Sequence, residues 1–302
     1  MFQSENRLKA LERWTQIGLF LTIIVGLVPF ILLASFSHPS GDNYCYTNVF
    51  NDPDIDGVLE GVMDWYRRWN GRYFSLLLIG SYFVYFDMMD TYRYVPYVLF
   101  LGWCFTSYYL LRSIIGTSDK FFQAAGGALG LCALYVLTMP LVSNGFYHVT
   151  GAFQYQTGNI LAMAAMACMI RIGSTRNPYP YSLASALLVF AVVGSTELHM
   201  ALMVILVSSV TLYLFSTQDR NRHIWIFLLL VTLLSSALLI LAPGNEGRGR
   251  HFAARHQLWF SIVESVDHMG VWLLRWLGNP LLWLVTLLHV LWLWGFAKKS
   301  SF

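Results

Sequence analysis

The sequence predicts an all-α, polytopic membrane protein with about eight transmembrane helices. Hydrophobic residues make up 57% of the 302 residues and charged residues only 12%, whereas soluble domains carry about 25% charged residues. Apolar runs of about 20 residues, long enough to cross ~30 Å of hydrocarbon, recur along the chain. Basic residues gather at every second connection between these runs, as in cytoplasmic loops. We expect one transmembrane domain over residues 1–302, with both termini in the cytoplasm.

The first span is predicted at 17–36. Arg7, Lys9 and Arg13 precede it, which favours a cytoplasmic N-terminus. The run is longer than the apolar core of a signal peptide, and no small-residue cleavage site follows it. We therefore expect a retained span.

Segment 74–90 is apolar but short, and we expect it to lie in the outer interface without crossing. Under this assignment every inner connection is basic, whereas a crossing would place two basic connections outside. The remaining spans are predicted at 95–112, 121–141, 159–173, 181–197, 198–216, 223–242 and 279–297.

This topology places the longer polar stretches on the outer side, with interface helices in the first of them. They are loop 37–94, loop 142–158, the tight junction 194–199 and loop 243–278. The function is therefore expected to face outward. No G-x-x-x-x-G-K-[ST] phosphate loop is present, no basic tract suggests nucleic acid, and the four cysteines have no zinc-like spacing.

The first outer loop is unusually rich in charges and aromatic residues. Asp42 comes directly after the first span, beside Asn43 and Tyr44. A carboxylate at this place could act as a general base on an acceptor hydroxyl or help to hold a divalent cation, with Mg²⁺ or Mn²⁺ as the candidates. The alternative is a helix or turn cap, a common role of short acids.

Glu197 and His199 lie where one apolar run turns directly into the next. An ionisable residue at membrane depth is costly, which favours a functional role, catalytic in the case of Glu197. The alternative is that the junction lies at the interface and that Glu197 stabilises the N-terminus of the second helix.

The segment 242–251 closes a span at the predicted outer face. Pro243 and Gly244 end the helix, and Arg248 and Arg250 offer forked donors suited to phosphate. The alternative is a flexible turn whose arginines meet lipid head groups. In loop 142–158, His148, Gln154 and Tyr155 supply neutral donors and stacking faces suited to sugars, although an ordinary aromatic belt would look similar.

These stretches together resemble the polytopic GT-C glycosyltransferases, in particular a bacterial branch related to phage-type and O-antigen glucosyltransferases. The resemblance covers about residues 15–255. The motifs that carry it are, in order, Asp42-Asn43-Tyr44, Trp69-Asn70-Gly71-Arg72, Thr150-Gly151-Ala152-Phe153-Gln154-Tyr155, Glu197 and Ala242-Pro243-Gly244-Asn245. The second acid of the family's usual pair is Asn43 here, and its Thr-Gly-Ser-x-Asn-Tyr motif has Gln154 in place of Asn.

The resemblance implies a GT-C-like fold and transfer of a hexose or pentose from a polyprenyl-phosphate donor to a glycan, lipid or protein acceptor. The reaction would take place at the outer face of a bacterial inner membrane and serve the cell envelope. Asp42 would be the base of an inverting displacement, and Arg72, Arg248 and Arg250 would bind the donor phosphate. The residues implied in sugar or acceptor binding are Asn43, Tyr44, Asn70, His148, Gln154, Tyr155, His199 and Asn245.

Two other classes stay open. A lipid-linked-sugar flippase would use the same acids and arginines along a path through the membrane, with ionisable groups on both sides of the midplane. A non-catalytic subunit of an envelope-glycan assembly would need a partner subunit and would tolerate the loss of Asp42.

Overall fold

The computed structural model describes residues 2–116, 121–252, 257–280, 282–284 and 286–287. All regular structure in these ranges is helical, which confirms the predicted all-α class. Four helices among them are long and apolar enough to cross a membrane: Met88–Ile115, Val149–Ser174, Glu197–Ser216 and Arg222–Ile240. The predicted span 279–297 lies largely outside the described residues.

The N-terminal half begins with one long helix and continues with short ones. Helix α1 covers Phe2–Leu33 and is followed by the 3₁₀ turn η1, Ala34–Phe36. The first predicted outer loop then contains four α-helices and a 3₁₀ turn: α2 (Asp42–Phe50), α3 (Gly57–Arg68), α4 (Tyr73–Tyr85), α5 (Met88–Thr91) and η2 (Tyr92–Tyr94). With 13 residues, α4 is only about 20 Å long, too short to cross a bilayer alone.

The helices that follow lie within a few residues of six predicted spans, but α7 and α10 are not among the four that are long and apolar enough to cross a membrane. The six helices are α6 (Val95–Ile115), α7 (Phe121–Thr138), α9 (Thr157–Ser174), α10 (Tyr179–Val193), α11 (Glu197–Ser216) and α12 (Arg222–Ile240). Between α7 and α9 lie the π-helical turns η3 (Ser143–Tyr147) and η4 (Ala152–Gln156), with α8 (Val149–Gly151) between them.

Local signals explain where several of these helices begin. A proline stands in the first turn of α6 and of α10. Proline has no backbone N–H, but N–H groups in the first turn have no partner within the helix, so no hydrogen bond is lost. Helix α11 begins after Thr196, whose hydroxyl accepts a hydrogen bond from the backbone N–H of His199 at 3.3 Å. This threonine cap lets α10 and α11 follow each other with almost no loop.

The core consists of two clusters that meet at α9. The first cluster contains residues of α1 to α4 and α6 to α9 and of the turns η2 to η4, around Phe50, Ile79 and Phe146. Residues of α9 to α12 form the second, around Val189 and Leu228. Helix α9 packs against both α6 and α10, so it joins the two halves.

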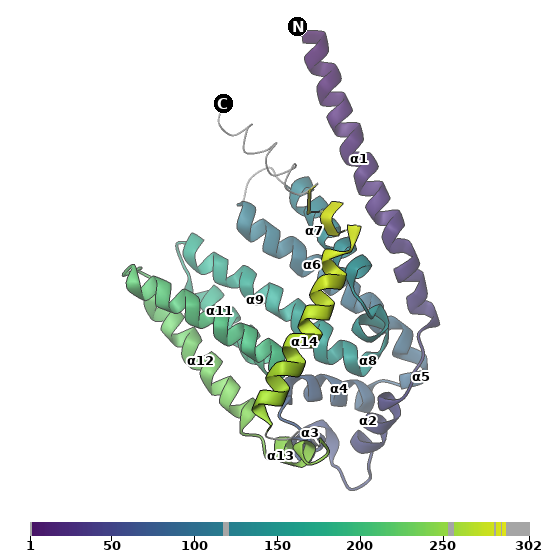
Figure 1. Ribbon diagram of the computed structural model, residues 1–302, viewed down its shortest axis with the longest axis vertical. Helices are drawn as coiled ribbons and strands as arrows, with labels where there is room; N and C mark the ends of the chain where they lie inside the picture. Colours follow the sequence, from purple (N-terminus) through teal and green to yellow (C-terminus); the bar gives the residue numbers. More distant parts are fainter. Residues whose placement is uncertain (1, 117–120, 253–256, 281, 285, 288–302) are drawn as a thin grey trace.

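The connections gather at the two ends of this helix assembly. Figure 1 shows α2, α3, α4 and α13 (Pro243–Gly249) together at one end, near the start of α11 and the end of α12. The connections α9–α10 and α11–α12 lie at the opposite ends of the same helices. The final helix described in full, α14 (Leu258–Leu277), falls in a stretch predicted as an outer loop. Its apolar residues recur with helical spacing, a signal that this prediction did not use.

Candidate functional site

A buried arginine paired with a glutamate forms the centre of the candidate site. Arg72 stands just before α4 and is only 8% exposed, and Glu197 is the first residue of α11. Nε of Arg72 donates to Oε1 and Oε2 of Glu197 at 3.2 and 3.0 Å, and Nη2 donates to Oε2 at 2.7 Å. Burial alone would lower the pKa of Arg72, but the hydrogen bonds and charge of Glu197 raise it above its ordinary value. The guanidinium therefore stays charged at any physiological pH.

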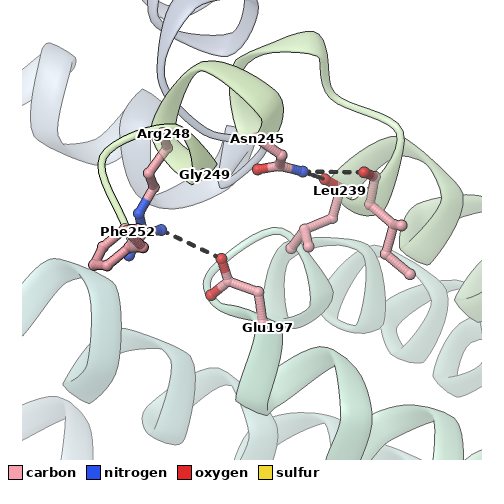
Figure 2. Close-up of a pocket in the computed structure, with 7 residues that line it drawn as sticks. Glu197, Leu239, Asn245, Arg248, Gly249 and Phe252 are labelled. Carbon is pink, nitrogen blue, oxygen red and sulfur yellow. Dashed lines mark hydrogen bonds and ion pairs between the residues drawn. The ribbon is translucent and has the colours of Figure 1, made fainter. Parts of the chain in front are cut away.

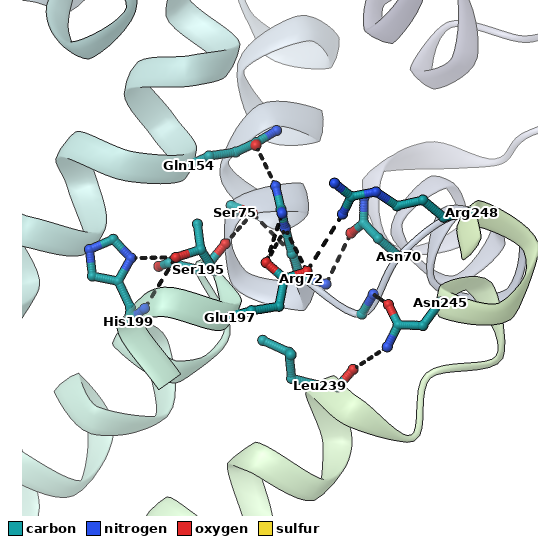
Figure 3. A network of polar contacts seen from close by, with 12 residues as sticks. Asn70, Arg72, Ser75, Gln154, Ser195, Glu197, His199, Leu239, Asn245 and Arg248 are labelled. Carbon is teal, nitrogen blue, oxygen red and sulfur yellow. Dashed lines mark hydrogen bonds and ion pairs between the residues drawn. The ribbon is translucent and has the colours of Figure 1, made fainter. Parts of the chain in front are cut away.

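A second guanidinium reaches the same carboxylate from α13. Nη1 of Arg248 lies 3.5 Å from Oε1 of Glu197, and the side chains of Arg248 and Glu197 are 30% and 46% exposed. The Arg248 guanidinium also lies over the ring of Phe252, 6.0 Å from its centroid. Two arginines share one carboxylate (Figure 3), so the cluster keeps one positive charge. Arg248 is the more accessible of the two cations, because its side chain is 30% exposed and that of Arg72 only 10%.

A glutamine and a tyrosine extend this cluster towards α2. Nη1 of Arg72 donates to Oε1 of Gln154 at 2.9 Å, and Nε2 of Gln154 donates to the hydroxyl of Tyr46 at 3.2 Å. The pKa of the Tyr46 hydroxyl is raised above its ordinary value, mainly by burial. The charge of Arg72 opposes this rise, and the charge of Asp42 adds to it. Asp42 and Arg72 thus both act electrostatically on the Tyr46 hydroxyl, which places Asp42 at the same end of the molecule as the arginine cluster.

Close backbone packing fixes the two segments that carry the arginines. A Cβ on Gly71 would overlap the carbonyl oxygen of Leu239 and lie 2.7 Å from Cβ of Ala242, so only glycine fits this contact. The side-chain amide of Asn245 holds the same two segments together, the one before α4 and the end of α12. Its Oδ1 accepts from the backbone N–H of Gly71 at 3.1 Å, and its Nδ2 donates to the carbonyl oxygen of Leu239 at 2.7 Å.

A cavity of about 350 Å³ opens beside this cluster. Figure 2 shows Arg248 and Glu197 in contact at this cavity, with Asn245 and Phe252 on the α13 side. Leu239 completes the wall. The cavity therefore combines the Arg248 guanidinium and the Glu197 carboxylate with an apolar wall. Because Arg72 also pairs with Glu197, the net charge of the cluster is positive, as needed for an anionic group attached to an apolar chain.

Three of the predicted sugar-binding or acceptor-binding residues are buried and hydrogen-bonded within the protein. Nδ2 of Asn43 donates to the hydroxyl of Tyr92 at 2.9 Å. His199 lies between the Thr196 hydroxyl, at 2.7 Å, and Oδ1 of Asn159, at 3.0 Å. Oδ1 of Asn70 accepts from the backbone N–H of Arg72 at 3.0 Å. These contacts support the loops, and burial leaves the three side chains little surface for a ligand.

The other predicted residues differ in how close they come to the cluster. Nδ1 of His148 accepts from the backbone N–H of Gly151 at 3.4 Å and caps α8. Tyr155 is partly exposed and contributes to the raised pKa of Arg72. Tyr44 is exposed. Arg250 pairs with Glu246 of its own helix at 3.4 Å and does not line the cavity.

The sequence analysis did not single out Tyr46, Phe252 or Asn159. Tyr46 follows the Asp42-Asn43-Tyr44 motif by two residues, and nothing in that motif indicated its contact with Gln154. Nothing in the sequence indicated that Asn159 contacts His199, 40 positions away.

Within the described ranges no three His, Cys, Asp or Glu side chains come together as a metal site. The predicted Mg²⁺ or Mn²⁺ therefore stays a prediction, to be tested in solution. No family model, no curated protein and no solved structure matches the chain.

Proposed function

We propose that this protein is a membrane glycosyltransferase that moves a sugar from a polyprenyl-phosphate donor to a glycan, lipid or protein acceptor. The observation that carries the proposal is the positive charge of Arg248 at a cavity with an apolar wall. A lipid-linked phosphate has the complementary chemistry, an anion on an apolar chain. In this proposal the cavity faces the outside of a bacterial inner membrane.

The donor phosphate binds to Arg248 in this proposal. Guanidinium groups bind phosphate with two parallel N–H donors, and their charge stabilises the anion that forms as the glycosidic bond breaks. Glu197 positions Arg248 through their 3.5 Å contact. Arg72 has donors committed to Glu197 and Gln154, so it acts as a positioning residue behind Glu197.

Asp42 is the proposed base. Its side chain is exposed and makes no hydrogen bond or ion pair with any residue that the structure describes. Glu197 is less suited to this role, because arginines contact both of its oxygens. Asp42 takes the proton of the acceptor hydroxyl, the acceptor oxygen bonds to the anomeric carbon, and polyprenyl phosphate leaves with the electron pair of the broken bond. One displacement inverts the configuration at this carbon.

The positions of the buried polar groups favour a transferase over a transporter. Among the described residues, the chain of contacts from His199 through Asn159 to Tyr135 stays at the end of the helices that carries Arg72. Near the middle of the helices, Thr106 and Thr232 donate to carbonyl oxygens four residues earlier, as threonines in apolar helices commonly do. A path for a charged head group would need ionisable residues there.

A transfer assay tests this proposal. Purified protein in nanodiscs receives radiolabelled polyprenyl-phosphate sugars and a membrane glycan fraction, with and without Mg²⁺ or Mn²⁺. We expect label to move to the acceptor, and Asp42→Asn to reduce the rate at least 100-fold, the usual scale for loss of a general base.

Asp54→Asn is the matched control, because Asp54 is an exposed acid of the same outer segment and should leave the rate unchanged. Normal turnover by the Asp42→Asn protein would refute the assignment of the base. Saturable donor binding without transfer under any condition would instead identify a non-catalytic subunit or a transporter.

A further inference from the structure

A second cavity, of about 500 Å³, lies between the α9–α10 and α11–α12 connections. Arg176, Tyr179, Arg220, Asn221, His223 and Phe227 are among the residues that line it. Asn221 ties the α11–α12 connection to the last turn of α9, since its Nδ2 donates to the carbonyl oxygen of Ile172 at 3.4 Å. The cavity is thus formed by two segments that are held together at its base.

The cations of this cavity have no counter-charge in the described part of the chain. The side chains of Arg176 and Arg220 make no hydrogen bond or ion pair with any described residue. The acid next in sequence, Asp219, does not line the cavity, and its Oδ1 accepts from the backbone N–H of Asn221 at 2.7 Å. Two guanidinium groups are therefore free to bind an anion.

Exposed apolar side chains continue from the cavity along the adjoining helices. On α10, Tyr179, Leu183 and Leu187 follow one another at four-residue spacing and are all strongly exposed, which places them on one face of the helix. On α12, Phe227 and Leu230 are also exposed. The basic cavity therefore lies at one end of an exposed apolar surface on α10 and α12.

The cavity is far from the candidate active site. Arg220 follows the C-terminal end of α11, whereas Glu197 begins this helix, and its 20 residues span about 30 Å. If α11 crosses the membrane, the two cavities lie at opposite boundaries. The basic connections place this second boundary on the cytoplasmic side.

We propose that this cavity binds the headgroup of an anionic phospholipid. Arg176 and Arg220 bind the phosphate, and the acyl chains lie along the exposed apolar faces of α10 and α12. This surface distinguishes a lipid from a soluble phosphate compound, which would gain nothing from it. The proposal depends on membrane insertion of α11 and α12 and is independent of sugar transfer.

Lipid binding to the delipidated, full-length protein tests the proposal. Native mass spectrometry in detergent would titrate phosphatidylglycerol, phosphatidylcholine and inorganic phosphate against the wild type and the Arg176→Gln/Arg220→Gln variant. We expect phosphatidylglycerol to bind the wild type best. The variant should bind phosphatidylglycerol at least tenfold more weakly, as loss of charged hydrogen bonds implies, and should bind phosphatidylcholine as before.

Arg222→Gln is the matched control, because Arg222 directly follows the same connection but does not line the cavity. The affinity of this variant for phosphatidylglycerol should stay at the wild-type level. An equal loss in this control would show that general loop charge attracts the lipid and would overturn the proposal. Competition by inorganic phosphate with an affinity equal to that of the lipid would also overturn it, in favour of a soluble phosphate ligand. Arg176 and Arg220 are exposed and Arg222 is half-buried, and an unchanged melting temperature would show that the variants are folded.

Discussion

The contact between Arg72 and Glu197 should show a large energetic coupling. Replacing Glu197 by Gln removes the charge that holds a buried guanidinium through three hydrogen bonds. Breaking a fully buried ion pair costs about 3–5 kcal/mol, whereas exposed pairs contribute at most about 1 kcal/mol. Arg72 is buried but Glu197 is 46% exposed, so we expect a coupling of about 2 kcal/mol, between these limits.

A double-mutant cycle measures this coupling. The free energy of unfolding in mixed micelles is determined for the wild type, Arg72→Met, Glu197→Gln and the double variant. The exposed pair Arg250–Glu246 is the matched control, with side chains 70% and 60% exposed and an expected coupling of about 0.5 kcal/mol or less. A value for Arg72 and Glu197 no larger than that of the control would refute the claim that this pair organises the site.

Further predictions concern the crossing between the segment before α4 and the end of α12. Gly71→Ala should destabilise the protein by about 1–3 kcal/mol, since its Cβ would overlap a backbone oxygen. Gly126→Ala, where nothing lies within 4 Å of the added carbon, should leave the melting temperature unchanged or slightly higher, and equal effects would contradict the packing argument. Asn245→Ala should cost about 1–3 kcal/mol of unfolding free energy through lost hydrogen bonds and make α13 more sensitive to protease, whereas unchanged proteolysis would show that Asn245 does not hold this helix.

Composition and periodicity predicted most of the helices, because apolar runs and their flanking residues are local signals. The tight junction before Glu197 and the end of α12 shortly before Pro243 were both visible in this way. The helix α14 was missed because its residues were treated as a polar outer stretch, although Trp259, Ile262 and Val266 recur with helical spacing.

The candidate site was predictable in its residue types but not in its contacts. Arg72, Glu197 and Arg248 were all singled out, yet the pairing of Arg72 with Glu197 joins positions 125 apart, and no local pattern encodes such a contact. Asn43 shows the opposite case, since the family resemblance implied that it binds sugar or acceptor. In the fold its amide is buried and bonded to Tyr92, and only tertiary packing decides this.

Binding of polyprenyl phosphate to the Arg248→Ala and Arg250→Ala variants tests the central claim most directly. Both arginines belong to the same short segment, but only Arg248 lines the cavity and contacts Glu197. The account predicts that Arg248→Ala weakens binding at least tenfold, as expected for loss of a charged hydrogen bond of about 1.5–3 kcal/mol, and that Arg250→Ala leaves it within about twofold, as expected for an exposed pair. Equal affinities of the Arg248→Ala variant and the wild type would contradict it.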